Sequence, residues 1–348
     1  MPTDQVSATE DARAAARERV DNIMTPDRAY SLASAGAAPR ANEDGRDDEL
    51  VDRGRNGYFA PSQPTSRPAS SPSNDTLIFI HLYKTGGTTL NRIIEWEYKM
   101  SKICSVEPTW WQWSYQRITR WSPRRLNKME VFKGHMPFGL HRLLPRPANY
   151  VTVLREPVER AISDYYFARR FKPHRHHRAA LQLSLEEFFL QKHEHNLQSR
   201  ILAGPNSHEL FPSVCDAGTL AAAKDNLARR FIVVGLTERF DETLALLKVL
   251  LGWQIRRYRS FRVADNRVAR HEVAAKTLAL IRERERFDIA LYDYASSLFD
   301  KAIAAHRETV EAMLPSIRKA REMTSLDSRY YFASSIARAI ICRAHSLL

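Results

Sequence analysis

Cysteine is scarce in this sequence: its 348 residues include three, Cys104, Cys215 and Cys342. They are odd in number, lie far apart and form no Cys-x-x-Cys pair, which argues against a disulfide framework and a cysteine-based metal site. No other metal-ligand cluster stands out, so we expect no bound metal. Few, separated cysteines suit a reducing compartment, and we therefore expect a cytoplasmic location.

Long hydrophobic runs are missing as well. Residues 1–20 have no apolar core of the signal-peptide type. No stretch approaches the roughly 18 apolar residues that a membrane-spanning helix needs. The nearest candidate, YYFASSIARAIIC (Tyr330–Cys342), is short and is interrupted by Arg338. It predicts a packed terminal helix, with peripheral membrane contact as the weaker alternative.

Acidic residues are outnumbered over most of the chain. The formal net charge is +13, but residues 1–75 hold 9 Arg against 13 Asp and Glu, a net charge of −4. Residues 76–348 therefore carry +17. A body this basic suits anionic partners, namely a nucleotide, a nucleic acid, an acidic glycan or a membrane surface. Ordinary solubility charge is the simpler alternative.

Composition divides the chain into three parts. Residues 1–74 are rich in proline, serine and charge. They offer little apolar surface to offset the entropy of ordering, so we expect a disordered acidic tail. One domain is expected over residues 75–320, followed by a C-terminal helical extension over residues 321–348.

Strand-like and helix-like runs alternate within residues 75–320. Short β-branched apolar runs predict buried strands, and amphipathic runs predict helices between them. The strands are expected at residues 75–81, 129–135, 149–155 and 230–240, and the helices at 88–100, from Pro157, at 241–253 and at 288–314. This alternation predicts an α/β domain with a central parallel sheet flanked by helices.

The stretch HLYKTGGTTL (residues 81–90) joins the first expected strand to the first expected helix. A glycine turn before a helix favours a bound phosphate, because backbone N–H groups there are unpaired and the helix dipole attracts an anion. Lys84 precedes the glycines, however, so the stretch does not match the G-x-x-x-x-G-K-S/T pattern of mononucleotide loops. A metal-bound triphosphate is therefore less favoured. A plain glycine turn capped by threonine is the alternative.

A second stretch, VTVLREPVERAISDYY, offers another phosphate site. It places Arg155 at the end of an expected strand and Ser163 on the helix that follows. Arg155 is a forked donor suited to a terminal phosphate, and Ser163 adds a hydroxyl. Parallel sheets bind ligands at the carboxyl ends of their strands, so the two sites suit one nucleotide with phosphates at both ends.

Three motifs together resemble the sulfotransferases that use 3′-phosphoadenosine 5′-phosphosulfate (PAPS). KTGGTTL resembles their 5′-phosphosulfate loop and LREPVERAIS their 3′-phosphate element. VFKGHMPF is similar to the segment that carries the catalytic histidine of the heparan sulfate 2-O- and 6-O-sulfotransferases. The resemblance covers about residues 76–300 and implies a P-loop NTPase-like sulfotransferase fold. Tyr83 departs from it, since many relatives have proline there.

The resemblance implies a role for each matching residue. Lys84 would contact the bridging oxygen and the leaving phosphate, and His135 would be the base that takes the proton of the acceptor hydroxyl. Arg155 and Ser163 would hold the 3′-phosphate. The 5′-phosphosulfate would be wrapped by Thr85, Gly86, Gly87, Thr88 and Thr89.

The implied activity is transfer of a sulfuryl group from PAPS to a hydroxyl of a carbohydrate, either a glycan or a glycolipid, by in-line displacement. His81 and His141 compete with His135 for the role of base. No nucleic acid is expected as a partner. Two alternatives stay open: a P-loop kinase-like phosphotransferase, against which the missing Gly-Lys-Ser/Thr argues, and a basic nucleic-acid-binding protein.

Three segments are candidates for further contacts. RRFKPHRHHR (Arg169–Arg178) would either hold an acidic glycan or form a solvated loop. WWQWSYQRITRW (Trp110–Trp121) offers aromatic faces for sugars or bases, although packing of a helix on the core is favoured. The resemblance places three residues near the 3′-phosphate and the adenine: Ser260, Arg262 and Asn266.

Overall fold

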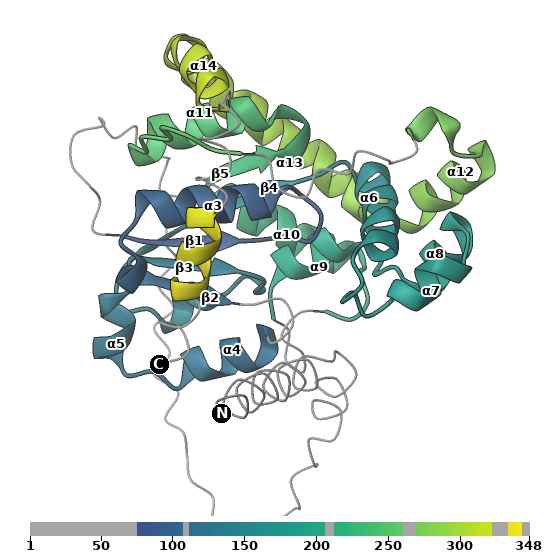
Figure 1. Ribbon diagram of the computed structural model, residues 1–348, viewed down its shortest axis with the longest axis horizontal. Coiled ribbons are helices and arrows are strands. Elements are labelled where there is room, and N and C mark those ends of the chain that lie inside the picture. Colours follow the sequence, from purple (N-terminus) through teal and green to yellow (C-terminus); the bar gives the residue numbers. More distant parts are fainter. Residues whose placement is uncertain (1–74, 107–110, 206–211, 260–268, 322–332, 343–348) are drawn as a thin grey trace, which may run out of the picture. The chain divides into compact units, whose positions relative to one another are not determined.

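The computed structural model, which describes residues 75–106, 111–205, 212–259, 269–321 and 333–342, is built around a five-stranded sheet (Figure 1). All neighbouring strands pair in parallel, in the order β2-β3-β1-β4-β5. The strands are β1 (Thr76–Ile80), β2 (Ile103–Val106), β3 (Val131–Gly134), β4 (Ala148–Leu154) and β5 (Phe231–Leu236). The predicted α/β class is confirmed. The strand β2 was not predicted, because ICSV is too short to stand out from its surroundings.

Helices fill the connections between the strands. Before β4 they are α3 (Gly87–Glu97), α4 (Trp111–Thr119) and α5 (Pro123–Lys128). Between β4 and β5 lie α6 (Pro157–Arg170), α7 (His177–Gln182), α8 (Leu185–Lys192), α9 (Leu197–Ala203) and α10 (Ala217–Arg230). After β5 come α11 (Phe240–Leu251), α12 (Ala275–Arg284), α13 (Arg286–Ala305) and α14 (Arg307–Arg321), with short 3-10 turns such as η2 (Leu140–Leu143) and η3 (Thr237–Arg239).

Several helix ends follow from local sequence. Pro157 opens α6, where the carboxylate of Glu156 accepts the N–H of Glu159 at 2.7 Å. Gly252 ends α11 in the left-handed region, as expected for a glycine after a helix. The helix predicted over residues 288–314 is two helices, because the chain turns at His306 between α13 and α14.

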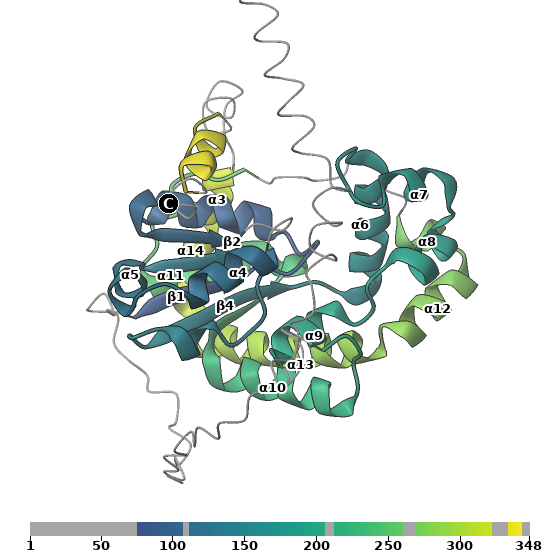
Figure 2. The same cartoon turned by 90° about the horizontal axis from the view of Figure 1, so that it is seen from below.

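The strand β1 lies at the centre of the sheet and every residue in it is buried. Helices cover both faces: in Figure 2, α3 lies on one side of the sheet and α9, α10 and α13 lie on the other. A strand covered on both faces has no polar side, which is why its sequence is an unbroken apolar run after Thr76.

The helices α6, α7, α8 and α12 group together beyond the carboxyl ends of the strands (Figures 1 and 2). A buried charge cluster holds this group to α13. Arg160 of α6 is 1% exposed and lies 3.1 Å from Glu285 and 3.9 Å from Asp288. His193 lies 3.0 Å from Arg160 and 2.9 Å from Asp164. Burial by itself would raise the pKa of Glu285, but Arg160 and His193 hold that pKa well below its usual range.

The same cluster fixes the start of α9. Asp288 accepts the N–H of Gln198 at 3.0 Å and both the N–H and the hydroxyl of Ser199 at 2.7 Å. Asn196, in the left-handed region at φ 49°, bonds the opening turn of α13 through its side-chain oxygen. These bonds compensate the charge of Asp288 in the interior and bring α9 against α13.

Residues 333–342 form a helix that packs on α3. Arg338 donates to the carbonyl of Glu95 at 2.8 Å, and the indole of Trp96 donates to Ser335 at 3.2 Å. The predicted packed terminal helix is therefore confirmed for these residues. Within the described ranges, no helix is both long and apolar enough to span a bilayer.

The charge cluster leads to a stability prediction. Arg160→Ala would leave Glu285 and Asp288 buried without their guanidinium, so we expect the free energy of unfolding to fall by about 3–5 kcal/mol in urea titrations. Arg229→Ala is the matched control, because its pair with Asp225 on α10 is exposed and should contribute less than about 1 kcal/mol. Equal losses in the two variants would contradict the importance of the cluster.

Candidate functional site

The segment from His81 to Gly87, called here the glycine loop, connects β1 to α3. Lys84 and Gly86 both adopt positive φ, 68° and 78°, so the chain makes a tight reversal before the helix. The buried hydroxyl of Thr85 donates to the carbonyl of Leu82 at 3.0 Å and closes the turn from inside. The loop is therefore an ordered turn that leads directly into a helix N-terminus.

The start of α3 is open to an approaching group. Its N-cap is Gly86, which has no side chain to bond the first turn. Gly86 is exposed, Thr88 is half-buried, and Thr89 is buried with its N–H bonded to the carbonyl of Gly86 at 3.0 Å. A Cβ on Gly87 would lie 2.0 Å from the ring of His81, so only glycine fits there. Backbone donors at such an end favour an anion.

Arg155 lies directly against the glycine loop. Its guanidinium donates to the carbonyl of Lys84 at 3.1 Å and lies 3.8 Å from the carboxylate of Glu159. Its backbone is held by Gln198, whose side chain accepts the Arg155 N–H and donates to the Arg155 carbonyl, both at 3.0 Å. The two segments expected to bind phosphate are thus adjacent in space, because β1 and β4 are neighbouring parallel strands.

Ser163 lies half-buried in the middle of α6. Phe167 is one turn further along the same helix, so the two side chains share a face. The ammonium of Lys84 lies 3.7 Å from the centre of the Phe167 ring, a cation–π contact. The face of α6 that carries Ser163 is therefore the face that Lys84 contacts.

His135 follows the end of β3 and lies beside the glycine loop. Its ring stacks between His81, at 4.2 Å between ring centres, and Tyr83, at 4.0 Å. Gly134 before it adopts φ 128° and has no room for a Cβ, which would lie 2.0 Å from the carbonyl oxygen of Val106. This close approach of the backbones sets the position of His135, whose N–H bonds to that same carbonyl at 3.1 Å.

The two competing histidines have other contacts. His81, the first residue of the glycine loop, packs its ring against Gly87, and its Nδ1 lies 3.1 Å from the amide of Asn91. His141 lies in η2, 2.9 Å from the hydroxyl of Tyr150, and its ring lies tilted against that of Phe138. Tyr150 pairs with Ile78 in the middle of β1, so His141 lies away from the strand ends where the glycine loop begins. The structure places His135, and not His141, against the glycine loop.

Sequence reasoning missed two residues that hold the site together. Thr237, in the turn after β5, donates its hydroxyl toward the carbonyls of Thr85 and Leu154, each at 2.9 Å. It therefore links three strand ends at one point. Gln198 is the second, through its bonds to Arg155. Both lie within residues 76–300, over which the resemblance extends, but a buried polar residue in a short loop gives no distinctive pattern. Tyr83 was noted only as a departure, yet it supports the ring of His135.

Three residues that the resemblance places near the 3′-phosphate and the adenine lie outside the described residues: Ser260, Arg262 and Asn266. In the part of the chain that the structure describes, no group of three or more His, Cys, Asp or Glu side chains is placed to hold a metal ion. The basic run 169–178 forms the end of α6, the turn that follows and the start of α7, and it begins two residues after Phe167, which Lys84 contacts.

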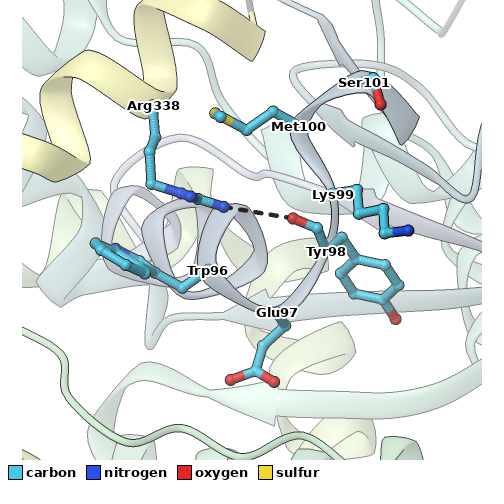
Figure 3. Close-up of a pocket in the computed structure, with 7 residues that line it drawn as sticks. All are labelled: Trp96, Glu97, Tyr98, Lys99, Met100, Ser101 and Arg338. Carbon is cyan, nitrogen blue, oxygen red and sulfur yellow. Dashed lines mark hydrogen bonds between the residues drawn. The ribbon is translucent and has the colours of Figure 1, made fainter.

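A surface hollow of about 560 Å³ lies at the opposite end of α3 from the glycine loop. Figure 3 shows residues 96–101 around it, with Arg338 reaching from the C-terminal helix to the carbonyl of Tyr98. A helix of this length separates the two ends by roughly 16 Å. The hollow is therefore distinct from the candidate site.

Known proteins are similar to this chain over most of its length. It is 28% identical to human galactose-3-O-sulfotransferase 3, over 74% of this chain and 64% of that protein. It is 27% identical to heparan-sulfate 6-O-sulfotransferase 2 of Danio rerio, over 72% of this chain and 64% of that protein. It is 24% identical to a heparan sulfate 2-O-sulfotransferase of Caenorhabditis elegans, over 75% of this chain and 87% of that protein. The chain thus spans slightly less than two thirds of the first two relatives.

The predicted likeness to carbohydrate sulfotransferases is confirmed by these matches. A family model described as galactose-3-O-sulfotransferase matches residues 54–328, which is well over half of the chain. On this match, with the glycine loop, Arg155 and His135 brought together at one edge of a parallel sheet, the chain belongs to the galactose-3-O-sulfotransferase family.

Proposed function

We propose that this protein transfers a sulfuryl group from PAPS to a hydroxyl of a carbohydrate. The observation that carries the proposal is that Arg155 and His135 both contact the glycine loop, at the Lys84 carbonyl and at Tyr83, in a chain of this family. Relatives named as galactose-3-O- and heparan sulfate sulfotransferases support a carbohydrate acceptor. The family match favours neither a kinase nor a nucleic-acid-binding protein. A cytoplasmic location stays a prediction from the cysteine usage.

The described residues fit a donor with phosphate groups at both ends. The first N–H groups of α3, at Gly87 and Thr88, would bind the 5′-phosphosulfate, because Gly86 leaves them without a side-chain cap. Arg155 and Ser163 would bind the 3′-phosphate. The fixed backbone of Arg155, bonded twice by Gln198, limits the entropy that this side chain loses on binding.

The reaction needs charge stabilisation on one side of the sulfur and a base on the other. The acceptor oxygen forms a bond to sulfur while the bond from sulfur to the bridging oxygen breaks and its electron pair leaves with the phosphate. Lys84 would stabilise the negative charge on that oxygen, which is commonly a large part of catalysis. His135 would accept the proton of the acceptor hydroxyl. Lys84 would exchange the Phe167 ring for the donor, since an anion attracts an ammonium more strongly than a ring does.

The direct test uses PAPS labelled in its sulfate, incubated with the protein and a panel of neutral and acidic glycans and glycolipids. We expect label in at least one carbohydrate, and we expect the product nucleotide PAP to raise the melting temperature through binding to the folded state. Absence of both effects would overturn the proposed function. Magnesium-dependent turnover of ATP would instead favour the kinase alternative.

Lys84→Ala should lower the transfer rate by about 10²–10³-fold, because one preorganised charge at the leaving oxygen is lost. Rates of label transfer at saturating PAPS measure this effect. Lys99→Ala is the matched control, since Lys99 is exposed at the other end of α3. A Lys84 variant as active as the Lys99 variant would show that another group meets the leaving oxygen.

His135→Asn keeps a polar side chain between His81 and Tyr83 but removes the base. We expect turnover to fall by about 10²–10⁴-fold while PAP still stabilises the protein. Turnover assays and thermal melts with PAP separate these two quantities. His141→Asn serves as the control and should retain most activity. The reverse pattern, with His141 essential and His135 dispensable, would move the base to His141.

A further inference from the structure

A group of aromatic side chains continues outward from Lys84. Phe171 stacks on Phe167, with 5.1 Å between ring centres and 16° between ring planes. His174 meets Phe167 edge-on at 5.6 Å. Phe171 is 38% exposed. We call Phe167, Phe171 and His174 the aromatic shelf. It begins under the ammonium of Lys84 and ends at the surface.

The chain that follows the aromatic shelf approaches the part of the candidate site that contains Tyr83 and His135. Arg175 follows His174 and pairs with Glu194. Burial raises the pKa of the Tyr83 phenol, and the charges of Glu194 and Arg175 also act on it, which places this pair near Tyr83. The Tyr83 ring stacks on His135. The turn between α6 and α7 therefore runs from Lys84 toward His135 and borders the space where an acceptor hydroxyl has to lie.

The positive charge around the aromatic shelf comes from neighbouring lysine and arginine side chains and not from histidines. Burial lowers the pKa of His174, with Arg175 and Lys84 acting in the same direction against Asp164. Burial and Arg175 lower the pKa of His176 to about 4. Both imidazoles are therefore neutral at physiological pH. Lys172, beside Phe171, is exposed and brings an ammonium group to the surface.

We propose that the aromatic shelf is the acceptor subsite, where a sugar ring of an acidic glycan stacks on Phe171 and its carboxylate or sulfate group contacts Lys172. The inference rests on the proposed function and adds the residues that select the acceptor. A flat apolar ring next to an exposed cation fits a sugar that carries an anionic group. Lys84, where the shelf starts, would meet the leaving oxygen, so the acceptor has to lie beyond it. The turn that follows the shelf runs toward Tyr83 and His135, and a sugar on Phe171 would present its hydroxyl from that side.

The test compares two probes, heparan sulfate as the acidic acceptor and lactose as the neutral one, with labelled PAPS. Phe171→Ala should raise the KM for heparan sulfate about tenfold through loss of the stacking surface. The kcat and the affinity for PAP should stay near those of the natural protein. Leu190→Ala, an exposed apolar residue of α8, is the matched control and should change none of these values. A raised KM for PAPS in the Phe171 variant would make the shelf part of the donor site and overturn the proposal.

Lys172→Glu tests the charge separately. It should raise the KM for heparan sulfate and leave the lower activity on lactose unchanged, because only the acidic acceptor meets the charge. Equal activity of the natural protein on both probes, or an equal effect of the variant on both, would overturn the proposal that the acceptor is an acidic glycan. If the natural protein transfers label but Phe171→Ala leaves every acceptor KM unchanged, the shelf fails and the proposed function stands. If the natural protein transfers no label to any carbohydrate, both fail.

Discussion

The buried pairing of Arg160 with Glu285 and Asp288 decides where α6 lies. Burying three charged groups is tolerated only because each has partners, and those partners come from three separate helices. Once α6 is fixed to α13, the residues on its exposed side have fixed neighbours. Ser163 and Phe167 then face the glycine loop, and the aromatic shelf begins in the last turn of α6. A charge cluster away from the reacting groups thus sets the geometry of one wall of the site.

The other wall depends on close packing of backbones at the strand ends. Gly87 leaves room for the ring of His81, and Gly134 lets its strand end approach Val106. His81, His135 and Tyr83 then stack as consecutive layers. Thr237 joins the loop to the ends of β4 and β5. The carboxyl ends of parallel strands lie at one edge of the sheet, so the residues that follow each strand meet in one place.

In the proposed function, the two walls would have separate tasks: one would bind phosphate and the other would recognise the carbohydrate. The glycine loop and Arg155 use backbone donors and one guanidinium, which suit any phosphate ester in the right position. In the same proposal, selection of the acceptor would depend on the turn between α6 and α7, a surface segment outside the sheet.

The sequence by itself determined the local structure. Apolar runs such as TLIFI, helix spacing, and the proline and glycine signals located most strands and helices, because these patterns reflect contacts between near neighbours. The motifs also selected Lys84, Arg155 and His135, which the fold brings to one edge. Only the tertiary structure decided that Lys84 rests on Phe167, that Gln198 holds Arg155, and that Thr237 joins three strand ends. These contacts join residues far apart in the chain, and their geometry depends on how whole helices pack, which no local pattern encodes.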